Sequence, residues 1–168
     1  MTNLCEWEKI PYLSERDMKT LTKHVNRRRS NSSKSQYIRG LAYDLLHSDE
    51  LELNKKGEEL MLKMIEQYPN EKYAVMTGHL ILGKYYRSIS DYTNAIAHYR
   101  TVMEYNHSME GMSIGLPEMD IATTIIQYGN TDDYDYAKEV MTFVDPRKLF
   151  IEREKQQYRV IMNELYKQ

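Results

Sequence analysis

Apolar and small residues recur every three or four positions along most of this chain, which is the spacing that one face of an α-helix requires. The clearest example runs from Met76 to His107, where the pattern breaks at residues 88–90 and then resumes. This stretch predicts two amphipathic helices joined by a tight turn. The face of the first helix carries His79, Leu82, Gly83, Tyr86 and Ile89. The face of the second carries Tyr92, Ala95, Ile96, Tyr99, Val102 and Met103.

Small residues on both faces predict that these two helices touch. Gly83 costs about 1 kcal/mol relative to alanine inside a helix, so its presence favours the close approach of a neighbouring helix. Ala95 is small enough to allow the same contact, and Tyr99 fills the space beside it. Ser90 and Asp91 offer a turn and side-chain oxygens that can cap the first amides of the second helix.

The rest of the chain predicts further helices of the same kind. They lie at about 14–29, 36–47, 51–68, 118–129, 133–144 and 146–166. Serine-rich residues 30–35 predict a linker or a helix break, and residues 106–117 predict a loop. Residues 1–13 are expected to form an extended or one-turn segment that lays Trp7 on the body. Leu149 and Phe150 are expected to pack near the start of the last helix.

The central residues resemble a known family. His79-x2-Leu82-Gly83-x2-Tyr86, followed by Ala95-x3-Tyr99, is similar to the tetratricopeptide repeat pattern W-x2-L-G-x2-Y…A-x3-F. This sequence departs from it at His79, at Tyr99, and at His107, where the family has a proline. The alternative is an ordinary helical hairpin.

Parts of the pattern recur on either side of the centre. The phrase Asp91-Tyr92-x2-Ala95 returns as Asp133-Tyr134-x2-Ala137, and Gly57 takes the place of Ala95 upstream. These small residues are spaced by 38 and 42 positions, which exceeds the roughly 34 of the family repeat. The resemblance implies an all-α, short right-handed superhelix, or solenoid, of about three hairpins. We expect one structural domain with an N-terminal segment and basic helix (1–35), hairpins (36–145) and a C-terminal capping helix (146–168).

Composition indicates the cellular compartment and the distribution of charge. Cys5 is the only cysteine, so no disulfide can form within the chain, which suits a reducing cytoplasm. No apolar run approaches the roughly 20 residues that span a bilayer, so no membrane association is expected. The charge is uneven, because residues 1–40 hold 9 Lys and Arg against 4 Asp and Glu, whereas residues 41–168 hold 14 against 21.

Few residues suggest chemistry. The five histidines show no metal-binding spacing, and the acids at 132, 133 and 135 lack the glycine and the final glutamate of a calcium loop. Cys5 has no surrounding motif, and nucleotide-binding glycine patterns are missing. We therefore expect neither catalysis nor a cofactor. Arg27, Arg28 and Arg29 either contact phosphates or form a solvated helix end.

The resemblance places a partner groove along the first helix of each hairpin. Its outward positions here are Arg39, Tyr43, Thr77, Leu80, Lys84, Arg87, Met119 and Thr123. Ala42, Leu80 and Thr123 stand where some family members hold a peptide's terminal carboxylate with polar or basic groups, which argues against that mode. Lys84 and Arg87 beside Leu80 suggest a peptide with a hydrophobic side chain next to an acid. Alternatively, these two cations only pair with nearby surface acids.

These observations predict non-catalytic recognition of a protein or peptide in the cytoplasm, by an adaptor, a chaperone or an immunity-type protein. The alternative is a peptide-responsive regulator that contacts nucleic acid through its basic N-terminal helix. Salt would separate the two, because affinity that depends on phosphate contacts falls steeply as salt rises. The sequence leaves the partner's identity and the oligomeric state open.

Overall fold

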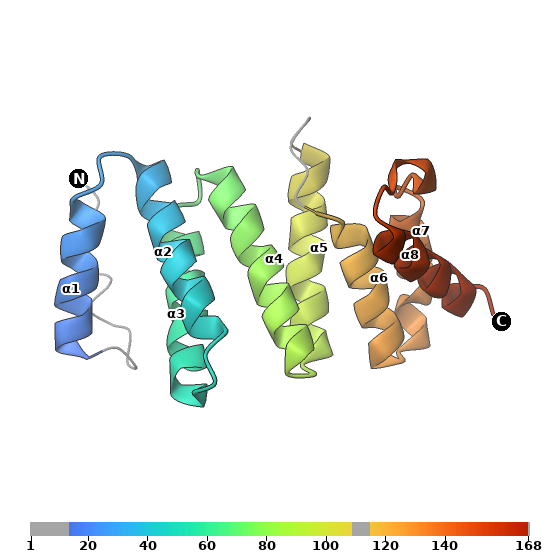
Figure 1. Ribbon diagram of the computed structural model, residues 1–168, viewed down its shortest axis with the longest axis horizontal. Coiled ribbons are helices and arrows are strands. Elements are labelled where there is room, and N and C mark those ends of the chain that lie inside the picture. Colours follow the sequence, from blue (N-terminus) through green and yellow to red (C-terminus); the bar gives the residue numbers. More distant parts are fainter. Residues whose placement is uncertain (1–13, 109–114, 168) are drawn as a thin grey trace. The chain divides into compact units, whose positions relative to one another are not determined.

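The computed structural model describes residues 14–108 and 115–167, and all regular structure in them is helical (Figure 1). The prediction of an all-α chain is confirmed. The described residues form two compact units, Met1–Ile81 and Leu82–Gln168, and the division falls inside one helix. The α-helices are α1 (Glu15–Asn26), α2 (Asn31–Leu46), α3 (Leu51–Gln67), α4 (Lys72–Ser88), α5 (Tyr92–Ser108), α6 (Pro117–Tyr128), α7 (Tyr134–Met141) and α8 (Glu152–Leu165).

Local capping determines where the first helices begin. Ser14 and Asp17 form a capping box, in which the Asp17 amide donates to Ser14 Oγ at 3.2 Å and the Ser14 amide donates to Asp17 Oδ2 at 3.2 Å. Ser30 caps α2, because its Oγ accepts from the Ser33 amide at 3.1 Å. A linker or a helix break was predicted at 30–35, and the break between α1 and α2 lies at residues 27–30, slightly earlier than predicted. The serines of that stretch cap and begin a helix that we expected to start at residue 36.

In the first unit, α2 and α3 meet at a glycine. A Cβ on Gly57 would lie 2.7 Å from the Leu46 amide nitrogen and 2.8 Å from the Ala42 carbonyl oxygen, so only glycine fits between these backbones. Asn54 Nδ2 donates to the carbonyls of Leu45, Leu46 and Ser48. These hydrogen bonds supply partners to carbonyl groups at the C-terminal end of α2, which have none within the helix. Gly57, the counterpart of Ala95 in the repeat pattern, is thus a helix-contact position.

In the second unit, the turn between α4 and α5 follows the prediction. Ser90 takes a left-handed conformation with φ +63°, and the Asp91 amide donates to the Tyr86 carbonyl at 2.9 Å. Asp91 Oδ1 then accepts from the Asn94 amide at 3.2 Å and caps α5. Ile89 was expected on the packing face but is exposed, because the helix ends there and the chain turns away from the core.

The contact between α4 and α5 is also as predicted. A Cβ on Gly83 would lie 2.9 Å from Tyr99 Cε1, so the bare glycine provides room for the fully buried tyrosine ring. Ala95 is likewise fully buried. Gly83, Ala95 and Tyr99 therefore pack with complementary shapes and stabilise the hairpin, since protein interiors are packed to crystal-like density.

The last hairpin has a shorter second helix than predicted. Gly129, with φ +73°, ends α6, and a 3-10 helix (Thr131–Asp133) leads into α7. Another 3-10 helix (Pro146–Lys148), capped by Asp145, is separated from α8 by an extended Leu149. The predicted single helix from residue 146 is therefore wrong. Leu149 is buried as expected, but Phe150 is 86% exposed, because the break directs the two neighbours to opposite sides.

Some predictions fall outside the described residues. They concern Cys5 and Trp7 in the N-terminal segment, and the apolar residues of 109–114. Helix α5 extends to Ser108, so the start of the predicted 106–117 loop is helical. Within residues 14–108 and 115–167, every helix is too short or too polar to cross a bilayer.

Candidate functional site

Helices α2 and α4 enclose a groove of about 410 Å³ in the first unit. We call it the α2/α4 groove. Its walls are Arg39, Gly40, Tyr43 and Asp44 from α2, and Tyr73, Thr77, Leu80 and Ile81 from α4. Four of the residues predicted to face a partner, namely Arg39, Tyr43, Thr77 and Leu80, therefore lie around one cavity.

Arg39 is held in position without being neutralised. Its Nη1 donates to Thr77 Oγ1, and its guanidinium carbon lies 5.5 Å from the centre of the Tyr73 ring. Thr77 Oγ1 in turn donates to the Tyr73 carbonyl at 2.7 Å, which orients the hydroxyl to accept from Arg39. No carboxylate within the described ranges forms an ion pair with Arg39. Most of its five N–H donors thus remain available to a ligand oxyanion.

The groove also offers exposed aromatic surface. Tyr43 and Tyr73 both remain substantially accessible, and Tyr43 is held against His47 with ring centres 4.1 Å apart. Leu80 is partly exposed on the opposite wall. Such rings bury large area at little entropic cost, so they suit contact with apolar ligand side chains.

Two of the predicted outward residues are not outward. Met119 is almost completely buried, because α6 is covered on most sides and its buried residues include Met119, Ile121, Ala122, Thr124 and Ile125. It therefore cannot contact a partner as expected. Thr77 is also buried, and its contribution to the α2/α4 groove is to position Arg39.

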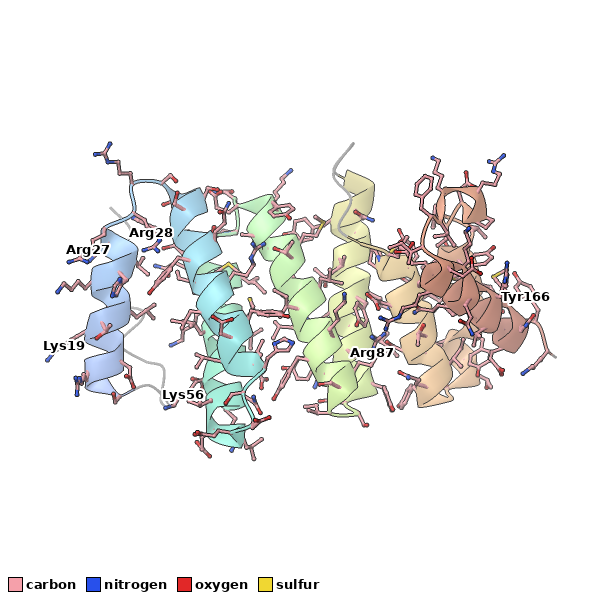
Figure 2. All side chains as sticks on the ribbon, in the orientation of Figure 1. Lys19, Arg27, Arg28, Lys56, Arg87 and Tyr166 are labelled. Carbon is pink, nitrogen blue, oxygen red and sulfur yellow. The ribbon has the colours of Figure 1, made fainter. Side chains whose placement is uncertain are left out.

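Lys84 and Arg87 form ion pairs with one acid of the second unit. Lys84 Nζ lies 3.4 Å from Asp120 Oδ2, and Arg87 Nη1 lies 3.2 Å from Asp120 Oδ1. Figure 2 shows Arg87 extending from α4 toward α6. Both cations are therefore engaged by one acid, as the pairing alternative predicted, although the single carboxylate balances only one of the two positive charges.

The eighth predicted residue, Thr123, lines a second groove. This α6/α8 groove encloses about 560 Å³, and its walls include Thr123, Ile126 and Gln127 of α6 and Arg153, Gln157 and Val160 of α8. Thr123 Oγ1 donates to the Met119 carbonyl at 2.7 Å and accepts from Gln157 Nε2 at 3.3 Å. Because its hydroxyl already both donates and accepts, Thr123 has little capacity left for a ligand.

The arginine triplet does not act as one basic patch. Arg28 lies with its guanidinium carbon 3.6 Å from the centre of the Tyr37 ring, and its Nη1 donates to the His24 carbonyl at 2.6 Å. Arg27 and Arg29 are exposed, and Figure 2 labels Arg27 and Arg28 near the end of α1. The middle arginine therefore serves the end of α1 and its contact with α2, as the helix-end alternative predicted.

The ionisable side chains whose pKa values are shifted lie at helix packing contacts and helix caps, not in the grooves. Burial lowers the pKa of His98, which stacks on Tyr86 with ring centres 5.3 Å apart. Burial, together with nearby Asp120, raises the pKa of Tyr99. Hydrogen bonds from Ser14 lower the pKa of Asp17 in its capping box. Among the described residues, no three His, Cys, Asp or Glu side chains gather as metal ligands would.

Three residues important to these sites were not predicted. Tyr73 lies four residues before Thr77 on the same helix face, so helical spacing was a usable signal. Asp44 directly follows Tyr43, but nothing in the pattern marked it. Asp120 pairs with cations 33 and 36 positions earlier, which only tertiary packing reveals.

Comparison with protein-family models, with curated proteins and with solved structures yields no match for this chain. The functional argument therefore depends on the residues of the α2/α4 groove.

Proposed function

We propose that this protein is a non-catalytic module, similar to tetratricopeptide repeats, that binds a protein or peptide partner in the cytoplasm. The observation that carries the proposal is Arg39, which is oriented by Thr77 and Tyr73 in an aromatic-lined groove and lacks a carboxylate partner in the described chain. A positioned, unneutralised guanidinium beside exposed tyrosines is suited to recognition, because Tyr and Arg dominate protein-binding hot spots.

The repeat character has separate support. Gly57, Ala95 and Ala137 are the small residues at corresponding positions of the three proposed hairpins, and all three are buried. This is the pattern expected when each second helix packs closely against its first. A short right-handed solenoid with α8 as its terminal cap is our proposal for the whole chain.

The ligand class follows from the groove. A peptide with a hydrophobic side chain next to an acid would place its carboxylate on Arg39 and its apolar group against Tyr43 and Leu80. This assignment keeps the ligand chemistry predicted from sequence. It moves the acid-binding role from Lys84 and Arg87, which both form ion pairs with Asp120, to Arg39, which pairs with no carboxylate among the described residues.

Peptide selection on the full chain tests the proposal. Peptides from a random display library would be selected on the immobilised protein, and their dissociation constants measured by calorimetry. Tyr43→Ala should raise the dissociation constant of the selected peptide by about tenfold, which corresponds to the loss of about 1.4 kcal/mol of binding free energy.

Tyr128→Ala is the matched control, because Tyr128 is also 45% exposed, as Tyr43 is, but lies in the second unit outside both grooves. It should leave affinity unchanged. Failure to select any peptide, or equal effects of the two substitutions, would contradict the proposed function and its site.

A further inference from the structure

The α6/α8 groove is positively charged, although the second unit as a whole is acidic. Arg87 and Arg153 both line this groove, together with one acid, Glu164. Glu164 already forms an ion pair with Lys167, which follows α8. Residues 82–168 hold 10 Lys and Arg against 13 Asp and Glu, so the positive charge of the groove is a local feature.

Both arginines of the groove retain hydrogen-bond donors. Arg153 is exposed and forms no ion pair or hydrogen bond with another described residue. Arg87 shares the Asp120 carboxylate with Lys84, so one positive charge of that cluster is unbalanced. Within the described ranges, all hydrogen bonds of Arg87 start from Nη1, which leaves Nε and Nη2 to donate to a ligand. Two guanidinium groups of one groove can therefore bind carboxylates.

Three glutamines line the same groove. Gln127 of α6 and Gln156 of α8 are exposed. Gln157 Nε2 donates to Thr123 Oγ1 at 3.3 Å, which holds the third amide in place and leaves its oxygen to accept. A side-chain amide both donates and accepts, so it matches the free N–H and C=O groups of an extended peptide. A helical peptide satisfies those groups internally and would leave the amides unused.

The groove also has apolar surface. Ile161 is buried beneath it, Ile126 is partly exposed, and Val160 is 55% exposed. In an extended chain, successive side chains point to opposite sides, so acidic side chains can reach the arginines while apolar neighbours cover this surface. A nucleic acid is disfavoured, because its closely spaced phosphates would also face the Glu164 carboxylate and its backbone would leave Val160 uncovered.

We propose that the α6/α8 groove is a second binding site, which takes an extended acidic segment of a protein partner. Carboxylates of the segment bind Arg87 and Arg153, its backbone forms hydrogen bonds with the glutamines, and an apolar side chain covers Val160. The site shares no residue with the α2/α4 groove, so it does not depend on the function proposed for that groove.

Three synthetic heptapeptides with blocked termini test this site on the full chain. Their residues alternate as Glu and Leu, as Gln and Leu, or as Glu and Ser, so each control lacks either the acids or the apolar groups. Calorimetry at about 0.15 M salt, where distant charges are screened, measures their dissociation constants. The Glu-Leu peptide should bind tightest. The Gln-Leu peptide should bind about tenfold more weakly, and the Glu-Ser peptide should also lose affinity.

Arg153→Glu should weaken the Glu-Leu peptide by about tenfold or more, because it replaces an available guanidinium with a repelling carboxylate. The side chain is exposed, so the fold should be retained, as a circular-dichroism melt would verify. Arg159→Glu is the matched control, since it makes the same charge change on an exposed site of α8 outside the groove. It should change affinity by no more than about twofold. Val160→Ser should weaken the Glu-Leu peptide but not the Glu-Ser peptide.

The outcomes separate this site from the α2/α4 groove. A Glu-Leu peptide that loses affinity in Arg153→Glu, and not in Arg159→Glu, supports the second site even if Tyr43→Ala has no effect or display selection fails. A peptide that loses affinity only in Tyr43→Ala binds the α2/α4 groove, which overturns this inference while the proposed function stands. Equal effects of Arg153→Glu and Arg159→Glu, or no binding by any of the three heptapeptides, also overturn it.

Discussion

Two glycines of the first unit sit in opposite surroundings. A Cβ on Gly57 would meet the backbone of α2 at 2.7 and 2.8 Å, whereas a Cβ on Gly40 would meet no atom within 4 Å. Gly40→Ala should therefore stabilise the protein by about 0.5–1 kcal/mol, the helix preference of alanine. Gly57→Ala should destabilise it by about 1–3 kcal/mol through overpacking. Urea unfolding of both variants checks this, and effects of the same sign would disprove the close α2–α3 contact.

Tyr99 carries a hydroxyl that the packing does not require. The side chain is fully buried, and its hydroxyl makes no hydrogen bond of good geometry among the described residues, although the Thr124 hydroxyl lies near enough to act on its pKa. Tyr99→Phe removes that unsatisfied group and keeps the ring beside Gly83, so stability should be unchanged or raised by about 1 kcal/mol. Thermal unfolding measures the change, with Tyr128→Phe as an exposed control. A loss above about 1 kcal/mol would show that the hydroxyl makes a bond in solution.

At the scale of the helices, Asp120 joins α4 to α6. It is 16% exposed and accepts from both Lys84 and Arg87. With Asp120 between them, Lys84→Glu with Arg87→Glu should destabilise the protein by about 1–2 kcal/mol, mainly through half-buried Arg87.

Helix α8 supplies the control for that prediction. Lys155 and Arg159 also share one acid, Glu152, but at 3.8 Å and with Glu152 75% exposed. Their double reversal makes the same charge change and should cost no more than about 0–1 kcal/mol. Equal losses in the two double variants, measured by urea unfolding, would show that the Asp120 pairs are no stronger than surface pairs.

At the scale of the whole molecule, charge argues against nucleic acid as the partner. Residues 41–168 carry 14 Lys and Arg against 21 Asp and Glu, and Arg28 is already engaged by Tyr37 and the His24 carbonyl. We predict no specific complex with labelled duplex DNA or RNA at about 0.15 M salt, where surface charges are strongly screened. Fluorescence anisotropy measures this. A sub-micromolar, salt-sensitive complex that Arg27→Gln, Arg28→Gln and Arg29→Gln together abolish would favour the regulator alternative.

The sequence by itself determined the helices and most of their packing faces. Helical periodicity is a local property, so α3, α5 and α6 begin and end within one to a few residues of prediction. The small residues Gly83 and Ala95 were identified as contact positions for the same reason. Local pattern reasoning failed at Ser30, where a cap begins a helix within a serine-rich stretch, and at residues 149–151, where extended backbone separates the 3-10 helix from α8.

Only the tertiary structure decided which charged side chains already pair within the protein and which can bind a ligand. Arg39 and Thr77 are 38 positions apart, and Asp120 is 33 positions from Arg87, so no local pattern could pair them. Helical spacing placed Arg39, Lys84 and Arg87 equally among candidate contacts. Packing then placed Lys84 and Arg87 in ion pairs with Asp120, whereas Arg39 is oriented by Thr77 and pairs with no carboxylate among the described residues. The reason is physical: the position of a side chain on a helix follows from its own segment, whereas its partners come from whichever segment folding brings beside it.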